Sequence, residues 1–302
     1  MVRMQVNIGG LIMKNPITNC SGTFESGQPY EDFVDVAALG AITAKGMSDE
    51  PWAGNDAPRM AEIFGGMINC IGLQNDGVDA WIKTDYPWLK EKGATIIANV
   101  VGRDTGGYLR VIERLETVDV DAYEINISCP NVSCGGASLG ANPDAAAEVV
   151  AECRKLTKRP MSVKLTPNVT DIAEVARSVE AAGADALSLI NSVQGMAIDA
   201  KTRKPKISRI IGGMAGPCLK PIALKCVWQC HNAVKIPIIG MGGITTGEDA
   251  AEFMLAGATA VGIGYSNFID PYSTTRVISE LEQFCKDSGI SDVNELIGGL
   301  QC

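Results

Sequence analysis

The chain has 302 residues, of which 46% are hydrophobic and only 5% aromatic, and it contains 33 glycines. This composition is typical of a globular α/β protein with many tight turns, and it excludes the fibrous and disordered classes. The net charge of −9 repels the phosphates of nucleic acids and anionic lipid headgroups, so neither is an expected partner.

The amino-terminal segment lacks the apolar core of a signal peptide, and no run approaches the roughly 20 apolar residues that span a bilayer. We therefore expect a cytoplasmic protein without membrane contact. The ten cysteines are expected to be free thiols, most of them in the core. No CxxC pattern occurs, so an iron–sulfur cluster is not expected in this chain. Cys226, Cys230 and His231 come nearest to a metal set, but their helical spacing fits buried packing, and no metal is predicted.

Short apolar runs alternate with helical patterns along the chain, which is typical of βαβ units and a parallel sheet. Helices are expected over residues 144–157, 171–182 and 248–256, among others. Gly183 and Gly257 follow two of them and should turn the chain back toward the next strand. The predicted strands cover residues 16–19, 41–44, 95–100, 122–126, 161–165, 186–190, 237–240 and 260–263.

Eight such units in about 250 residues predict one (β/α)8 TIM barrel domain spanning residues 1–302. The first dozen residues are left over, and we expect them to form a hairpin that closes the barrel bottom. Residues 46–79 and 192–221 are too long for simple connections and are rich in Gly, Pro and polar residues. We expect these long loops to fold over the C-terminal mouth, where barrel enzymes keep their sites.

Polar side chains stand at the ends of several predicted strands, where they would point into the mouth of the barrel. A purely structural protein needs no such ring of amides and ammonium groups, so the pattern favours a binding site. The residues are Asn19, Lys45, Asn99, Asn126, Lys164 and Asn191.

Glycines follow the last two predicted strands, in the segments 240–247 (GMGGITTG) and 262–265 (GIGY). Backbone amides without a neighbouring Cβ, close to a helix N-terminus, form an anion site, and in barrels this is the usual phosphate site. A phosphorylated cofactor or substrate is therefore predicted. Tight turns alone would explain one such loop more readily than both.

Cys129 lies in the segment 124–132 (EINISCPNV), directly after the fourth predicted strand. Pro130 restricts the backbone there, and polar residues surround the thiol, which is unusual for a buried structural cysteine. A nucleophilic cysteine needs an activating partner, but His231, the only histidine, is expected on an outer helix. A general base needs only a modest pKa shift, which Lys45 and Lys164 could supply.

Seven segments in order resemble the catalytic subunit of class 1B dihydroorotate dehydrogenases. The resemblance spans essentially the whole chain. In chain order the segments are MINCIGLQN (67–75), IIANV (96–100), NISCPNV (126–132), Gly135-Gly136, VKLTPNVTDI (163–172), IGGMAGP (211–217) and IPIIGMGGI (236–244).

The resemblance implies oxidation of dihydroorotate to orotate in pyrimidine synthesis, with FMN as hydride acceptor and Cys129 as the base that removes the C5 proton. Lys164 would face the flavin ring, where a cation stabilises the reduced form. The implied substrate contacts are Lys45, Asn69, Cys70, Ile71, Gly72, Leu73, Asn126, Asn131, Asn191 and Ser192. The implied FMN contacts are Ser21, Lys45, Gly46, Asn99, Asn126, Lys164, Ile190, Gly216, Gly242, Gly243, Gly264 and Tyr265.

Three positions depart from the family pattern: Leu139 stands where Phe is usual, Ala215 where Ser is common, and Tyr265 where Thr is frequent. The first bears on the loop beside Cys129, and the other two flank the predicted phosphate site. These departures affect expectations for loop motion and FMN affinity rather than for the reaction.

Class 1B enzymes pair this subunit with a second chain that carries FAD and a [2Fe-2S] cluster and passes electrons to NAD. The resemblance therefore implies a homodimer core joined by such an electron-transfer subunit. A class 1A homodimer that uses fumarate and an enzyme like dihydropyrimidine dehydrogenase remain flavin alternatives. A Schiff-base aldolase with Lys164 as nucleophile and a non-catalytic binding barrel represent other classes, although the binding barrel gives Cys129 no role.

Overall fold

A computed structural model describes residues 2–128 and 139–301 of the chain. Its centre is a sheet of eight parallel strands in the order β3-β16-β15-β10-β9-β8-β7-β4. A parallel bridge between Thr18 and Ala41 joins the first and last of these strands. The sheet is therefore a nearly closed barrel, which confirms the predicted (β/α)8 architecture.

The barrel strands match the eight predicted runs to within one or two residues at each end. They are buried along their length because helices cover the outside and side chains fill the inside. Their bounds are β3 (Ile17–Asn19), β4 (Ile42–Thr43), β7 (Ile96–Val100), β8 (Ala122–Asn126), β9 (Met161–Lys164), β10 (Ala186–Leu189), β15 (Ile238–Met241) and β16 (Ala260–Ile263).

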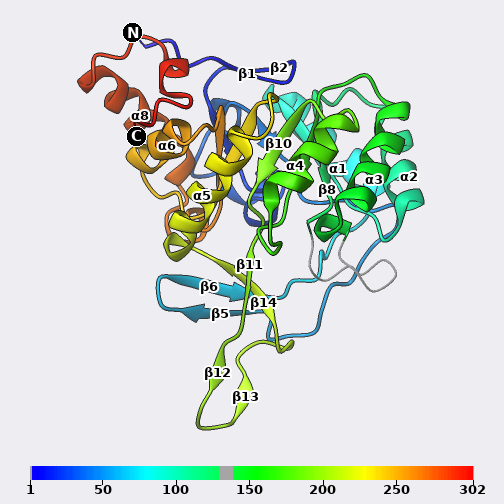
Figure 1. Ribbon diagram of the computed structural model, residues 1–302. Helices are drawn as coiled ribbons and strands as arrows, with labels where there is room; N and C mark the ends of the chain where they lie inside the picture. The colour runs from blue at the N-terminus through cyan, green and yellow to red at the C-terminus, as the bar shows by residue number, and fades with distance from the viewer. Residues whose placement is uncertain (1, 129–138, 302) are drawn as a thin grey trace.

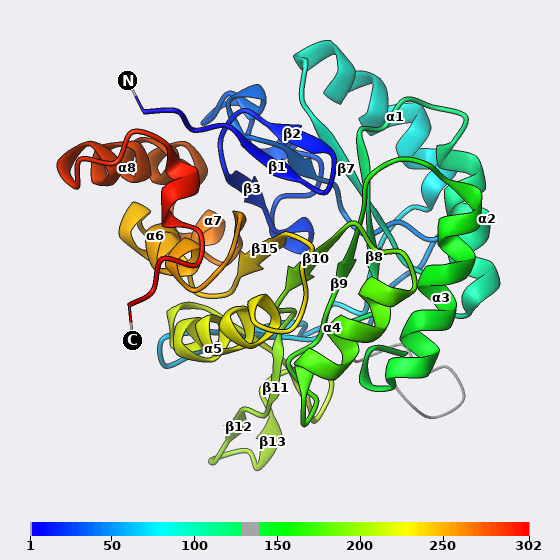
Figure 2. The same ribbon diagram turned by 45° about the horizontal axis from the view of Figure 1, so that its top comes forward.

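The helices surround this barrel, as Figure 2 shows. In α2, Tyr108, Val111, Ile112 and Leu115 are buried at helical spacing, and the Asp104 carboxylate caps the first turn by accepting from the Gly107 amide. The helices are α1 (Val78–Lys92), α2 (Thr105–Leu115), α3 (Pro143–Leu156), α4 (Ile172–Ala181), α5 (Lys220–His231), α6 (Gly247–Leu255), α7 (Ser266–Ile269) and α8 (Ser273–Asp287). None in the described part of the chain is long and apolar enough to cross a membrane.

Two predicted features of the segments between strands are seen in the structure: the glycine turns after α4 and α6, and the burial of two cysteines on α5. Gly183 after α4 and Gly257 after α6 have φ of +102° and +115°, backbone conformations that L side chains rarely adopt. On α5, Cys226 and Cys230 are buried in the main core, whereas His231 is exposed at the helix end. This arrangement is the one expected of cysteines that pack in the core.

The amino-terminal residues form the expected hairpin from β1 (Val6–Ile8) and β2 (Leu11–Met13). A Cβ on Gly9, in the turn, would lie 2.3 Å from the Asp185 carbonyl oxygen, so the turn lies directly against the chain entering β10. The hairpin therefore lies at the N-terminal ends of the barrel strands. In Figure 1 it stands at the top of the molecule.

The two long segments form a second, antiparallel sheet in the order β11-β14-β6-β5. Figure 1 shows it at the end of the barrel opposite the hairpin, with β12 and β13 projecting beyond it. Its position over the C-terminal mouth was predicted, but its strand structure was not. Its strands are β5 (Met60–Ile63), β6 (Gly66–Asn69), β11 (Val193–Gly195) and β14 (Gly212–Ala215), while β12 (Ile198–Asp199) and β13 (Lys204–Pro205) pair separately with each other.

Candidate active site

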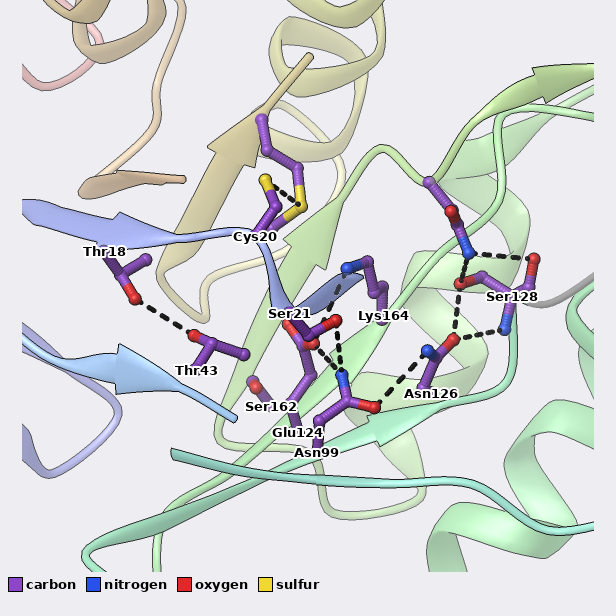
Figure 3. A network of polar contacts seen from close by, with 12 residues as sticks. Thr18, Cys20, Ser21, Thr43, Asn99, Glu124, Asn126, Ser128, Ser162 and Lys164 are labelled. Carbon is purple, nitrogen blue, oxygen red and sulfur yellow. Dashed lines mark hydrogen bonds and ion pairs between the residues drawn. The ribbon is translucent and has the colours of Figure 1, made fainter. Parts of the chain in front are cut away.

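The inside of the barrel contains a polar layer that strand register places together. Asn99 on β7 pairs with Glu124 on β8, and Glu124 in turn pairs with Ser162 on β9. One step nearer the mouth, Asn126 pairs with Lys164. Because neighbours in register on parallel strands point to the same face, these side chains all lie inside the barrel. Figure 3 shows them converging from three adjacent strands.

Hydrogen bonds connect this layer to the mouth. The Asn191 amide donates to Ser128 Oγ at 2.8 Å, and Ser128 Oγ donates to Asn126 Oδ1 at 2.8 Å. Asn126 Nδ2 lies 3.4 Å from Asn99 Oδ1, and Asn99 Nδ2 donates to the Glu124 carboxylate. The network holds its amides in fixed orientations, which is what recognition of a polar ring requires.

Lys164 is the buried cation of this layer. Its side chain is 7% exposed, and Nζ lies 3.6 Å from Oε1 of Glu124, whose side chain is 1% exposed. Lys45 lies nearer solvent, with Nζ 3.8 Å from the exposed Glu25 carboxylate. The site thus contains one lysine held by a buried carboxylate and one that is only loosely paired.

A cavity of about 350 Å³ opens above the polar layer and beneath the second sheet. Its walls combine the polar floor with apolar side chains such as Met67, Met214 and Met241. A cavity of this volume, with an apolar wall and a few convergent polar groups, suits a planar aromatic ligand.

Glycines from two loops meet at one end of the cavity. Gly242 and Gly243, after β15, have φ of +128° and +86°. A Cβ on Gly243 would lie 2.8 Å from the Lys220 backbone nitrogen and 3.0 Å from the Gly216 carbonyl oxygen. The two loops therefore approach as closely as glycine alone permits, and both also line the cavity. Backbone amides that no side chain obstructs can hold a phosphate.

Asp249 fixes the loop that carries these glycines. Its carboxylate accepts from the backbone amides of Thr245 and Thr246 and from Thr245 Oγ1, and it lies 2.6 Å from Lys220 Nζ. Burial opposes ionisation, but these hydrogen bonds outweigh it and lower the pKa of Asp249 to about 2. The loop is thereby held to α5 and to the first turn of α6.

Most of the predicted site residues line this one cavity. They are Ser21, Lys45, Gly46, Asn69, Ile71, Gly72, Leu73, Asn126, Lys164, Ile190, Asn191, Ser192, Gly216, Gly242, Gly243, Gly264 and Tyr265. Of the positions that depart from the family pattern, Ala215 and Tyr265 also line it.

Two predicted contacts lie elsewhere. Asn99 belongs to the layer below the cavity, where it supports Asn126. Cys70 is fully buried under the second sheet with Ile68, Ala197 and Ile207, and its Sγ lies 3.4 Å from Ser208 Oγ. The backbone of Cys70, rather than its thiol, connects the cavity residues on either side of it. Cys129 and Asn131 lie outside the described residues.

Sequence reasoning missed several residues of the site. Glu124 was read as part of a strand, although a carboxylate inside an apolar run is a signal that could have revealed it. Cys20 lines the cavity, and burial raises the pKa of its thiol to about 11, while nearby Lys164 opposes this shift only in part. Cys20 is therefore a neutral thiol at neutral pH. Phe268 on α7 also lines the cavity, and nothing in the sequence around it indicated this.

Comparison with known proteins yields one family. Residues 3–285 match a family model described as dihydroorotate dehydrogenase. Three relatives carry the name dihydroorotate dehydrogenase B (NAD(+)), catalytic subunit. The one from Alkaliphilus oremlandii is 50% identical over 297 residues, covering 98% of each chain. The one from Lachnoclostridium phytofermentans is 52% identical over 293 residues (97% of this chain, 98% of the relative), and the one from Geobacter sulfurreducens is 50% identical over 299 (99% and 98%).

Proposed function

Because the chain belongs to the dihydroorotate dehydrogenase family, we propose that it oxidises (S)-dihydroorotate to orotate in pyrimidine synthesis, with FMN bound in the cavity above β8 and β9. The observation that carries this proposal is that one cavity combines a buried lysine, a row of oriented amides and a glycine cradle. These are the groups that a flavin ring, a pyrimidine and a phosphate respectively require.

The residues present fit FMN. The close approach of Gly216 and Gly243 leaves backbone amides free of side chains at one end of the cavity, where the phosphate would bind. Lys164 and Asn126 at the floor would contact the ring, with Ser21, Gly46, Ile190, Gly264 and Tyr265 around it. When bound, FMN supplies the acceptor for the hydride that leaves C6 of dihydroorotate.

The remaining polar groups orient the substrate. Asn69 on β6 donates to the Gly213 carbonyl at 3.1 Å, which fixes the edge of its amide that faces the cavity. Asn191 is fixed by its bond to Ser128, and Lys45 offers a cation to the orotate carboxylate. Asn126 and Ser192 complete this set. The second sheet covers the cavity and so excludes water from the reacting face.

Cys129 is the base in this proposal and takes the proton from C5. It follows Ser128, whose hydroxyl joins Asn126 to Asn191, two residues that line the cavity. The chain thus leaves the described part of the structure at the cavity wall. Cys20, the cavity's described thiol, has its pKa raised to about 11, which makes it a poor acceptor of protons at neutral pH.

A partner subunit completes the proposed function, since the relatives are named as catalytic subunits that use NAD(+). We propose that this partner carries FAD and a [2Fe-2S] cluster, that the catalytic chains form a homodimer core, and that the complex works in the cytoplasm. The α7 face, defined as Phe33, Phe268, Ile269 and Tyr272, consists of exposed apolar side chains. Phe268 also lines the cavity, so this face connects the flavin site with the surface.

The relatives' names specify dihydroorotate as substrate and NAD(+) as acceptor, which favours neither the fumarate-dependent class 1A homodimer nor an enzyme like dihydropyrimidine dehydrogenase. An aldolase would need Lys164 free to attack a carbonyl, and in this structure its ammonium faces a buried carboxylate.

The colour of the purified protein tests the proposed function. The purified chain should be yellow with flavin absorbance, whereas colourless protein trapped by borohydride with a carbonyl substrate would support the aldolase and refute the proposal.

A further inference from the structure

Glu124 has no role in the function described so far. It lies in the middle of β8 and is 1% exposed, which makes it the most buried carboxylate among the described residues. It does not line the cavity, whereas Lys164 does. Figure 3 shows its side chain beneath Lys164, on the same side of the sheet as Asn99.

Two groups from neighbouring strands meet one oxygen of this carboxylate. Asn99 Nδ2 donates to Glu124 Oε1, and Lys164 Nζ lies 3.6 Å from the same atom. Asn99 also approaches Ser21 Oγ at 3.4 Å, and Ser21 lines the cavity. Glu124 is therefore the common partner of an ammonium group that borders the cavity and an amide that supports its floor.

The fold itself does not require this pair. Burying two charges costs several kcal/mol, and replacing such a pair by packed apolar residues is often neutral or stabilising. The outer face of the same strand is filled by Tyr123 and Ile125, both fully buried. The charged pair lies inside the barrel, directly under the cavity. An effect on the ligand in that cavity therefore explains the pair better than a contribution to folding does.

We propose that Glu124 is a positioning residue that sets the charge felt by the flavin through Lys164. The proposal rests on FMN occupying the cavity as described above. The Glu124 carboxylate holds the Lys164 ammonium at the cavity floor and partly neutralises its positive charge. The site can therefore hold the flavin in both its oxidised and its reduced state. Asn99 completes the anchor and keeps the carboxylate from turning away.

The consequence is a reduction potential that depends on Glu124. Reduced flavin carries negative charge on the pyrimidine side of its ring, and a nearby cation stabilises it. Glu124→Gln keeps an oxygen for the Asn99 amide but removes the negative charge. The ammonium of Lys164 then acts in full on the reduced ring, so the potential should rise.

The experiment measures the flavin potential of the purified holoprotein by equilibration with a redox dye. Glu124→Gln should increase the ratio of reduced to oxidised flavin at least tenfold at a fixed solution potential, about 30 mV for a two-electron couple. The matched control is Glu116→Gln, because Glu116 accepts from the Tyr123 hydroxyl on the outer side of the same strand. The control should change the ratio less than twofold.

A second pair of variants asks whether Glu124 acts through Lys164. In a Lys164→Gln background, the effect of Glu124→Gln should fall to less than half of its value in the wild-type background. An equal effect in both backgrounds would mean that Glu124 acts on the flavin directly, and it would overturn the proposal. So would an unchanged or lowered potential in Glu124→Gln.

If Glu124→Gln loses its flavin, Glu124→Asp decides the question. Its shorter side chain keeps the carboxylate charged but places it farther from Lys164. The ratio of reduced to oxidised flavin should therefore rise about threefold. A ratio equal to that of wild type refutes the inference. Failure of the proposed function would look different. A wild-type chain without flavin would refute FMN binding itself, whereas yellow proteins with equal potentials would refute only the role of Glu124.

Discussion

At the scale of single residues, two cysteines must be distinguished as candidates for the catalytic base. Cys20 lies in the cavity wall, 3.7 Å from the Met241 sulfur, and burial holds its proton in place. Cys129 follows Ser128 in the sequence and stands among the polar residues Asn126, Ser128 and Asn131. The base in our proposal is therefore the cysteine set among amides, not the one set among apolar groups.

Cys129→Ser tests this assignment. The variant should retain FMN, because no predicted cofactor contact is altered. Its flavin should be reduced by dihydroorotate at least about a hundredfold more slowly at pH 7, since a hydroxyl is a much weaker base than a thiol and general bases contribute roughly 10²–10⁴-fold. Rapid mixing under anaerobic conditions measures this rate. Cys20→Ser is the matched control, and a comparable loss there would shift the role to Cys20.

At the scale of elements, the barrel strands position the polar side chains of the site, and the loops that follow them add the glycines. Asn126 on β8, Lys164 on β9 and Met241 at the end of β15 line the cavity. The connections after β15 and before α5 bring glycines together. Asp249 is the link between these pieces, since it joins the β15–α6 loop to Lys220 on α5. Stability and cofactor binding are thus coupled at one carboxylate.

Asp249→Asn should destabilise the protein by about 2 kcal/mol at neutral pH, because a carboxyl pKa lowered from 3.8 to about 2 corresponds to this energy. The pKa is depressed in the folded state, so the contribution is present above pH 4 and is lost as pH falls toward 2. Thermal unfolding at pH 7, 4 and 2.5 measures it. Glu248→Gln, on the exposed face of the same turn, is the control. A difference from wild type that stays constant across this range would contradict the assignment.

The barrel strands could be predicted from sequence because each is a short apolar run between turn signals, and burial on both faces imposes that pattern. The second sheet could not. Its central pairing joins Asn69 to Gly213, residues far apart in the chain, and β11 has only three residues, none of them fully buried. Nothing local in either segment specifies a partner that distant.

The site shows the same contrast. Asn126, Lys164 and Asn191 were predicted because polar residues at strand ends point into the mouth. The Glu124 carboxylate below them was missed because it lies within the apolar run of β8 rather than at its end, although strand alternation places it on the same face as Asn126. Cys70 illustrates the opposite error: its neighbours line the cavity, but its own thiol turns into a small core under the second sheet.

At the scale of the whole molecule, the two ends of the barrel differ in what they expose. The bottom is closed by the β1–β2 hairpin, whereas the second sheet lies at the opposite end (Figure 1). The α7 face belongs to that end too, because α7 follows the C-terminal end of β16. Ile269 in that face is 68% exposed, and Phe33 and Tyr272 contact each other with ring centroids 5.8 Å apart. An ordered apolar surface beside the cofactor cavity fits a partner that receives electrons there.

Ile269→Asp should therefore separate two activities. Flavin reduction by dihydroorotate should match wild type, because the residue does not line the cavity. Reduction of NAD by the complex with the electron-transfer subunit should fall at least tenfold, since a charge is buried at the interface. Ile12→Asp, on the hairpin at the opposite end, is the control for an exposed isoleucine. Equal NAD reduction by wild type and Ile269→Asp would place the partner on another surface.

The proposed function requires that this chain hold FMN where dihydroorotate can reduce it. The most direct test is to mix the yellow, purified catalytic chain with (S)-dihydroorotate in the absence of oxygen and follow the flavin absorbance. The flavin should be bleached and one orotate should form per flavin, without any partner subunit. A flavin that stays oxidised while dihydroorotate remains unchanged would contradict it.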